Sequence, residues 1–342
     1  MQSPGFALLV FAAGLAVTLV ASDALVRGLD RLGARLGLSE GLLGLLTALG
    51  ADAPEVSSAL VALHAGNGAV GLGVVLGSNI FNLAALLGLG AVLAGHVRVH
   101  RQGLLLDGGV AALSTLITAG LVWGLLAPVA AAALLVVLFI PYCLVLGAPP
   151  RRLARLPLPW RLAPFLAVAV SEVDHESAED PRIGAAASPG AGPGSWLLAP
   201  LILVALAFIV GGSFALVSAA LALATAWRAP DALVGTVALA ALTSLPNAYA
   251  AARLALQGRG TAVVSETLNS NTINALAGVA LPALVFGGVA TRGPGRADLP
   301  WLLGMTVVAL ALLSRRRGLT RAGGGAIIAA YLLFVAWTAV NG

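Results

Sequence analysis

Ten long apolar runs dominate the sequence, and they decide what kind of fold the chain can adopt. Each run approaches the ~20 residues that an α-helix needs to cross a bilayer. Hydrophobic residues make up 59% of the 342 residues and charged residues 10%, so a soluble fold would leave much apolar surface in water. The runs are continuous and lack the alternation of membrane β-strands. We therefore expect an all-α polytopic membrane protein with ten transmembrane helices, at about 6–26, 41–64, 69–94, 104–124, 127–147, 196–223, 231–257, 261–287, 299–314 and 323–340.

The basic residues predict the orientation of these helices. The first run has no basic leader and no clear cleavage site, so we interpret it as a mature helix. All 19 basic residues are arginine. With residue 1 outside and ten crossings, only Arg228, Arg292 and Arg296 fall outside, which is a strong positive-inside pattern. The net charge of +5 is thus explained by topology, and we expect no nucleic-acid partner.

These patterns predict a multi-pass protein of the cell membrane with both termini outside the cytoplasm. The abundance of Ala, Leu, Gly and Arg with no Lys suggests a bacterial inner membrane. A single cysteine, Cys143, excludes an intrachain disulfide and a thiolate metal cluster. The four histidines are scattered over loops, and neither HExxH nor GxSxG with a partner histidine is present. We expect no enzyme and no resident cofactor, and no protein partner can be inferred.

The chain divides into two halves around a connector. Residues 148–195 are rich in Pro, Gly and Ser, with a basic start and an acidic centre, and predict a cytoplasmic linker. The first five-helix unit is then 1–147 and the second is 196–342. Within the first unit, Asp107 lies near the inner end of its helix beside Arg101, which favours an interfacial position.

The two halves carry the same motifs at one offset. ADAPE at 51–55 aligns with TSLPN at 243–247, and GSNIFN at 77–82 aligns with NSNTIN at 269–274, both shifted by 192. Because each half crosses the membrane five times, the second half enters from the opposite side. This predicts two inverted five-helix repeats with a substrate site near the bilayer midplane, where helices are broken.

The prolines and acids of these motifs raise the free energy of the protein in a bilayer unless a bound ligand compensates them. A proline inside a helix frees a backbone carbonyl, and a charged side chain at the bilayer centre costs ~2.5–3.5 kcal/mol or more. A hard cation bound by carboxylates, amide oxygens, hydroxyls and carbonyls offsets both problems. Ser78 and Asn82 share one helix face, as do Ser270 and Asn274. Polar contacts between helices are the alternative role, but four polar stretches at one offset favour a site.

These motifs resemble those of the calcium/cation antiporter superfamily, which includes the sodium/calcium exchangers. The likeness rests on two α-repeats, at about 41–93 and 234–282, and on residues 21–44. It implies ten helices in inverted repeats that exchange a cation, usually calcium, against sodium or protons. It also implies that Glu55, Asn82, the hydroxyls of Ser78 and Ser270, and the Thr243–Ser244 pair are ion ligands.

The sequence departs from this family where charge matters. The family usually has glutamate at the position of Asn247, and many members have aspartate at the position of Asn274. Asp52 and Glu266, one turn before Ser270, are additional acids. A calcium ion needs more than Glu55 for charge balance, so Asp52 or Glu266 must contribute, or the cation carries less charge. Alternatively protons replace sodium, since a buried carboxylate can take up a proton.

The sequence thus predicts a secondary active antiporter of inorganic cations, most simply calcium against sodium, working by alternating access. The alternatives are exchange of another cation, proton-coupled calcium exchange, or a transport-inactive relative acting as a membrane scaffold or ion sensor. The candidate cation-binding residues are Asp52, Glu55, Ser78, Asn82, Thr243, Ser244, Asn247, Glu266, Ser270 and Asn274. The direct metal ligands among them are expected to be Glu55, Asp52, Asn82, Asn247 and Asn274.

Overall fold

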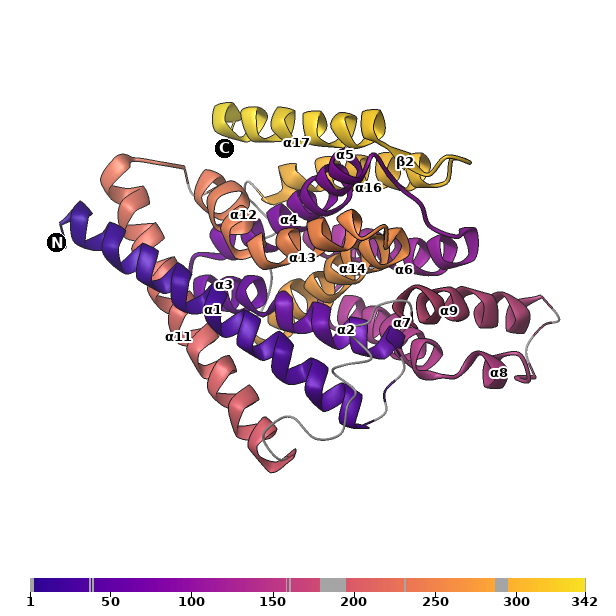
Figure 1. Cartoon of the computed structure of the whole chain (residues 1–342). Coiled ribbons are helices and arrows are strands. Elements are labelled where there is room, and N and C mark those ends of the chain that lie inside the picture. Colours follow the sequence, from indigo (N-terminus) through magenta and orange to yellow (C-terminus); the bar gives the residue numbers. More distant parts are fainter. Residues whose placement is uncertain are drawn as a thin grey trace.

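The computed structural model describes residues 3–36, 38, 40–157, 159, 161–178, 195–230, 232–286 and 295–341. The described chain is almost entirely helical, with one short two-stranded sheet (Figure 1). The helices of the first half are α1 (Pro4–Leu36), α2 (Glu40–Ala51), α3 (Ala53–His64), α4 (Gly68–Asn82), η1 (Leu83–Gly88), α5 (Leu89–Ala94), α6 (Arg101–Val122) and α7 (Pro128–Gly147). The connector contributes α8 (Pro150–Leu153) and α9 (Leu162–Ala178). The second half contains α11 (Ser195–Trp227), η2 (Leu233–Leu239), α12 (Ala240–Thr243), α13 (Leu245–Leu256), α14 (Gly260–Ile273), η3 (Asn274–Ala280), α15 (Leu281–Val285), α16 (Gly295–Leu313) and α17 (Arg321–Asn341).

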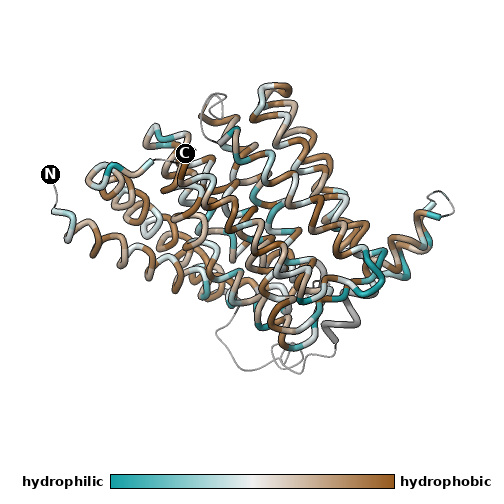
Figure 2. The backbone as a smooth tube through the Cα atoms, turned by 90° about the horizontal axis from the view of Figure 1, so that it is seen from above, coloured by the Kyte–Doolittle hydropathy of each residue, from teal (hydrophilic) through white to brown (hydrophobic). Residues whose placement is uncertain are grey.

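Seven of the described helices are long and apolar enough to cross a membrane. An eighth span is formed if η2–α12 and α13, which are bent by 47° at a short break, count as one. The protein is therefore an all-helical, multi-pass membrane protein. Figure 2 shows the same property as mostly hydrophobic helices with hydrophilic residues gathered around helix ends and turns.

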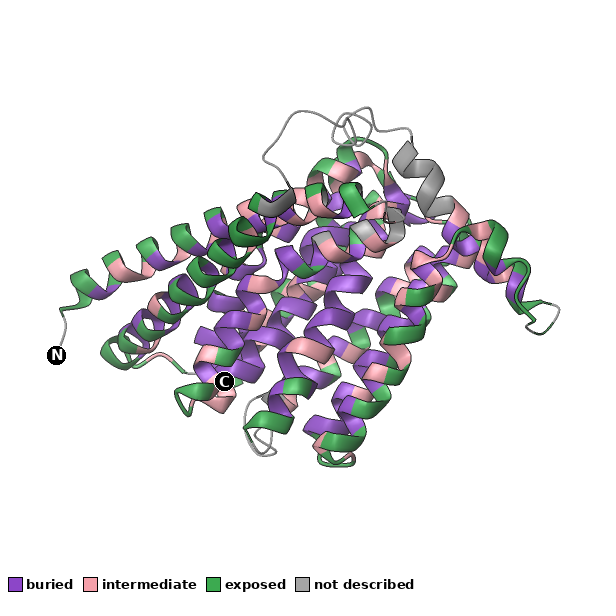
Figure 3. Cartoon of the chain, turned by 90° about the horizontal axis from the view of Figure 1, so that it is seen from below, coloured by how far each residue is buried: buried purple, intermediate pink, exposed green. Residues whose placement is uncertain are grey.

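The polar motifs lie in a buried central group of helices. The span formed by α4, η1 and α5 is 94% buried over its most apolar window, whereas α1 and α17 are mostly exposed to the surroundings. Figure 3 shows this contrast as buried central helices and exposed helix faces toward the edges. Lipid offers no hydrogen bonds to those outer faces, so the interior is the place where the polar motifs can be satisfied.

The longest helices, α1 and α11, pack against each other at one edge (Figure 1). A Cβ atom at Gly14 would lie 2.7 Å from the backbone nitrogen of Leu216, and one at Gly212 would overlap the hydroxyl of Thr18. Small residues therefore permit the close approach, as is common between membrane helices. On the outer face of α1, Asp23 and Arg27 form an exposed ion pair one turn apart.

Several backbone features recur at the offset of 192 residues. Asp52 interrupts the helix between α2 and α3, and Ser244 interrupts it between α12 and α13. The turns that follow both contain a glycine with positive φ, Gly66 at 79° and Gly258 at 77°. π-helical segments follow both Asn-rich motifs, as η1 and η3. The sequence repeat is thus also a repeat of local backbone structure.

The connector is more structured than a plain linker. Helix α9 packs against α6, α2 and α14, and it buries Leu166 and Val170 against the membrane helices. Its apolar positions account for this packing, whereas residues 179–194 lie outside the described part of the chain. The two short strands, β1 (His96–Val97) and β2 (Leu319–Thr320), pair antiparallel.

Candidate cation-binding site

The helix break in the first half is built around Asp52 and Pro54. The Asp52 backbone N–H still donates to the carbonyl of Ala48 at 2.8 Å, and helix α3 restarts with Pro54 in its first turn. Proline has no N–H, so the carbonyl of Gly50 loses its helical donor. The hydroxyl of Ser22, from α1, donates to that carbonyl at 3.1 Å. The break is therefore stabilised by a neighbouring helix, α1, and Asp52 lies at the centre of the break.

The break in the second half has the same plan with neutral residues. The Ser244 N–H donates to the Ala240 carbonyl at 3.2 Å, and Pro246 lies in the first turn of α13. The Thr243 hydroxyl donates to the carbonyl of Leu239 at 2.9 Å. Hydroxyl and carbonyl oxygens such as these are the ligand atoms that a membrane-buried cation requires.

The two breaks meet through the Asn247 side chain. Its amide nitrogen donates to Oδ1 of Asp52 at 2.6 Å and, more weakly, to Oε1 of Glu55 at 3.4 Å. The Ser270 hydroxyl also donates to Oδ1 of Asp52, at 2.8 Å. Two carboxylates from α3 and its N-terminal break thus face polar groups of α13 and α14.

Four asparagines join the halves through a reciprocal set of hydrogen bonds. Asn79 donates to the carbonyl of Asn271 at 3.2 Å, and Asn271 donates to the carbonyl of Asn79 at 3.2 Å. Asn82 donates to Oδ1 of Asn271 at 3.3 Å, and Asn274 donates to Oδ1 of Asn79 at 3.0 Å. Each bond has its counterpart at the offset of 192, so this cluster is locally two-fold in pattern.

The structure brings the sequence-predicted residues together in the protein interior. Nine of the ten are fully buried, with no solvent-exposed surface: Asp52, Glu55, Ser78, Asn82, Thr243, Ser244, Asn247, Ser270 and Asn274. The Ser78 hydroxyl lies 3.4 Å from the Ala240 carbonyl at the second break. Glu266, on α14, is partly buried and lies close enough to Asp52 for their charges to interact.

Buried oxygen atoms without hydrogen-bond donors concentrate in this cluster. They are Oδ2 of Asp52, Oε2 of Glu55, Oε2 of Glu266, and Oδ1 of Asn82, Asn247 and Asn274. Leaving such atoms unpaired in a low-dielectric interior is expensive, and a bound cation removes that cost. Within the described residues no group of three or more His, Cys, Asp or Glu side chains could hold a metal. The unpaired atoms at the site are oxygens of carboxylates and amides, which are the ligands that a hard cation prefers.

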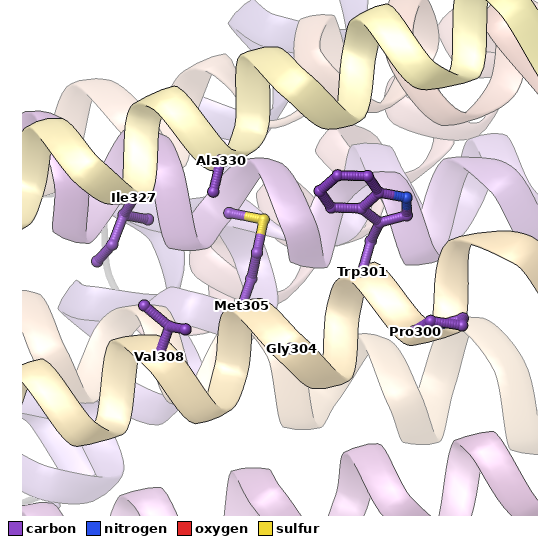
Figure 4. A pocket seen from close by; sticks show the side chains of 7 residues that line it. All are labelled: Pro300, Trp301, Gly304, Met305, Val308, Ile327 and Ala330. Atoms are coloured by element: carbon purple, nitrogen blue, oxygen red, sulfur yellow. The ribbon is translucent and has the colours of Figure 1, made fainter.

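An apolar cavity between two of the described helices has a different chemistry from the polar cluster. A cavity between α16 and α17 is lined by Pro300, Trp301, Gly304, Met305, Val308, Ile327 and Ala330 (Figure 4). None of these residues carries a charge, and the side chains drawn there are apolar apart from the indole nitrogen. This cavity has the chemistry of a lipid contact and not of an ion site.

The side chain of Asp107 does not extend outward beside Arg101, as its expected interfacial role implies, but lies buried between helices. Its side chain is 5% exposed and bonded to α7 and α14. The Tyr142 hydroxyl lies 2.9 Å from Oδ1 of Asp107 and 2.6 Å from Oδ1 of Asn269, and the Ser265 hydroxyl donates to Oδ2 of Asp107. One hydroxyl proton cannot serve both acceptors, so a second proton comes from the Asn269 amide or from a protonated Asp107 carboxyl. Packing of α6 against α14 overrides the proximity of Arg101 in the sequence.

Replacing Tyr142 by phenylalanine should therefore destabilise the protein by about 1–3 kcal/mol, because buried Asp107 and Asn269 lose a partner. Thermal unfolding of the purified protein measures the loss. Tyr249, which is 68% exposed, provides the matched Tyr→Phe control and should have little effect. Equal unfolding temperatures for the two variants would contradict a structural role for this cluster.

Two further groups of residues matter to the site but are not among the sequence candidates. Asn79 and Asn271 lie at its centre, and their occurrence at the same offset of 192 was an available signal. Ser22 supports the first break from α1, and no comparable pattern in the sequence points to it.

Comparison with known proteins identifies the family of the chain. The family profile described as "Sodium/calcium exchanger protein" matches residues 6–148 and 197–340. CaxA of Alkalimonas amylolytica is 39% identical over 82 residues, or 24% of this chain and 26% of that protein. The sodium/calcium exchanger MaX1 of Methanosarcina acetivorans is 33% identical over 87 residues, or 25% of each chain. The matched segments thus span about a quarter of these relatives' length.

The likeness to solved structures extends over the whole fold. The sodium–calcium exchanger NCX_Mj, soaked with Na⁺ and Sr²⁺, superposes with a TM-score of 0.62 at 21% identity, covering 97% of this chain and 98% of that one. With a profile match over most of both halves, the chain belongs to the sodium/calcium exchanger protein family, whose members are cation antiporters of the membrane.

Proposed function

We propose that the protein exchanges calcium against sodium by alternating access, at the site formed by the two helix breaks. The observation that carries this proposal is the set of fully buried, unpaired oxygens contributed by both halves around Asp52 and Glu55. A dehydrated cation replaces its water shell with such oxygens, and an occupied site satisfies them.

The proposed architecture is ten spans in two inverted five-helix repeats, 1–147 and 196–342, joined by the cytoplasmic connector 148–195. This architecture is supported by helix breaks, π-helical segments and glycines with positive φ that recur in the second half about 192 residues after the first. Helices α2–α3 and α14–η3–α15 would supply the two spans that their polar residues make hard to recognise by composition. The α-repeats would be 41–93 and 234–282, with both chain termini outside the cytoplasm of a bacterial inner membrane.

The charge balance of the site favours a divalent ion. Asp52 and Glu55 supply two negative charges, which match calcium. The acid that the family usually has at position 247 is absent, but Asp52 lies one hydrogen bond away from Asn247. We infer that Asp52 takes over the charge of the missing second-repeat acid, and that Asn247 and Asn274 contribute neutral oxygens. Glu266 is close enough to add further negative charge when sodium ions or a proton occupy the site.

The described conformation is compatible with an occluded step of the transport cycle. The nine fully buried candidates have no access to solvent, so an ion among them would be sealed from both sides. Alternating access then requires the bent second-half helix and its first-half counterpart to open toward one side at a time. Ions that share the same oxygens cannot bind together, which couples their opposite fluxes.

Transport into liposomes tests this proposal. Vesicles loaded with sodium and diluted into sodium-free buffer should accumulate radiolabelled calcium, and Glu55→Gln should abolish the uptake because it removes one of the two charges. Uptake driven by a proton gradient but not by sodium would favour a proton-coupled exchanger. No calcium uptake under either gradient would support a transport-inactive relative, which is an ion sensor if calcium raises its unfolding temperature and a scaffold if calcium does not.

A further inference from the structure

A polar cavity, lined in part by arginines, shares no residue with the candidate cation site. Its volume is about 690 Å³, within the range of small-molecule sites. It is bounded by the end of α5 with β1, by the α13–α14 turn and by the α16–α17 turn. Its charged and titratable lining consists of His96, Arg98, His100, Arg315 and Arg316.

Every charge on this lining is positive. Arg98, Arg315 and Arg316 are exposed, and none of them has a carboxylate partner in the described part of the chain. Three guanidinium groups around one cavity repel each other unless an anion sits between them. The guanidinium fork binds phosphate oxygens two at a time, so phosphate is the anion that this lining matches best.

The cavity has a fixed frame and is not a chance gap between loops. The β1–β2 pairing aligns His96 with Thr320 and Val97 with Leu319. A Cβ atom at Gly260 would overlap the carbonyl oxygen of Arg98, and one at Gly318, where φ is 66°, would overlap that of Val97. These glycines let the α13–α14 and α16–α17 turns press against the 96–98 backbone, so the arginines are anchored on a braced segment.

Exposed apolar residues also line the cavity, and they favour a lipid over a soluble phosphate compound as its ligand. Leu93 is 42% exposed one residue before the end of α5, and Leu256 is 65% exposed at the last residue of α13. Both line the cavity together with the arginines. Helix ends with exposed leucines on one side and arginines on the other are typical of the headgroup region of a bilayer.

We propose that this cavity binds the phosphate headgroup of an anionic phospholipid, with the acyl chains lying along Leu93 and Leu256. Basic pockets between membrane helices recognise anionic lipids in this way. The lipid would hold the ends of α5, α13 and α16 together at the membrane surface. This proposal depends on membrane insertion and on the cavity, and it is independent of which ions the protein exchanges.

Native mass spectrometry of the purified full chain in detergent tests the proposal. The protein is titrated with phosphatidylglycerol, with zwitterionic phosphatidylcholine, and with phosphatidylglycerol in the presence of inorganic phosphate. The pocket variant is Arg98→Gln/Arg315→Gln/Arg316→Gln. The matched control is Arg151→Gln/Arg152→Gln/Arg155→Gln, which removes three exposed arginines outside the cavity.

The expected result is tight binding of one phosphatidylglycerol by the wild type and the control variant, and weak binding of phosphatidylcholine. Because each arginine near a lipid surface contributes about 1 kcal/mol, the pocket variant should bind phosphatidylglycerol on the order of 100-fold more weakly. Equal affinity of the two triple variants would overturn the proposal. Displacement of the lipid by millimolar phosphate would instead assign the cavity to a soluble phosphate compound.

The pocket variant must be folded for this comparison to count. Its unfolding temperature without added lipid should equal that of the control variant, since none of the three guanidinium groups makes a carboxylate contact in the described residues. If the triple variant is unstable, the single change Arg316→Gln, at an exposed position, replaces it and should still weaken the binding of phosphatidylglycerol selectively.

Discussion

Asp52→Ser should reduce sodium-driven calcium uptake by at least two orders of magnitude. Opposite unit charges ~4 Å apart attract by ~4 kcal/mol at an effective dielectric of ~20, so losing one of two carboxylates lowers calcium affinity by on the order of 100-fold or more. The change also leaves the Asn247 amide and the Ser270 hydroxyl without the acceptor they share at 2.6 and 2.8 Å. Initial rates of calcium uptake into proteoliposomes measure the effect.

A second pair of variants moves the carboxylate from position 52 to position 247 instead of deleting it. The Asp52 carboxylate and the Asn247 amide are in direct contact, so a glutamate at position 247 places its carboxylate in the same space. We expect Asn247→Glu alone to impair exchange, because three acids then crowd one ion. The double variant Asp52→Ser/Asn247→Glu should recover a large part of the uptake lost in Asp52→Ser.

The control for charge relocation is Asp52→Ser/Asn274→Glu, which restores the number of acids at a different place. Asn274 bonds to Asn79 and not to Asp52, so its replacement should not rescue uptake. Equal rescue by both double variants would mean that only net charge matters. No rescue by Asn247→Glu would contradict the inference that Asp52 stands in for the second-repeat acid.

Gly77→Ala should be the most damaging single change to stability among the glycines of the core. Helix α4 packs against η2 so closely that a Cβ atom at Gly77 would overlap the carbonyl of Thr236. On the opposite side of this contact, a Cβ at Gly235 would lie 2.7 Å from the carbonyl of Val70. Backbone atoms cannot change rotamer as a side chain can, so the helices must move apart. We expect this to lower the free energy of unfolding by about 3 kcal/mol.

Thermal unfolding of the purified protein, followed by tryptophan fluorescence, measures this cost. The matched control is Gly211→Ala in α11, where an added Cβ meets no atom within 4 Å and the helix propensity improves equally. The control should unfold at or above the wild-type temperature, and Gly77→Ala several degrees below it. Indistinguishable unfolding of the two alanine variants would show that α4 and η2 are not held at this distance.

Much of the fold and of the candidate site follows from patterns that are local in the sequence. Pro54 and Pro246 mark the helix breaks because proline removes a hydrogen bond wherever it stands. The repeated Ser–Asn motifs predict one shared polar centre because residues four apart lie on one helix face. Both features depend on neighbouring residues, and the structure places them as expected.

What the sequence does not reveal depends on partners that are distant along the chain. The environment of Asp107 is made by Tyr142 and Ser265, and no local pattern tells which helices will pack around it. The sequence offers Asp52 and Glu266 as additional acids, but only the structure shows that Asp52 is the one in contact with Asn247. The same holds for α9, whose packing on α6 depends on the position of α6 in the bundle.

The reciprocal asparagine bonds constrain how such a chain can change over time. Asn79 gives its amide to Asn271, accepts from Asn274, and offers its backbone carbonyl in return. A substitution at one of these positions therefore disturbs partners in the other half as well. The equivalent positions 52 and 244 carry residues of different charge, Asp52 and Ser244, whereas both halves have asparagine where they hydrogen-bond to each other. The centre of the molecule would then be its slowest-evolving part even if the transported ion changed.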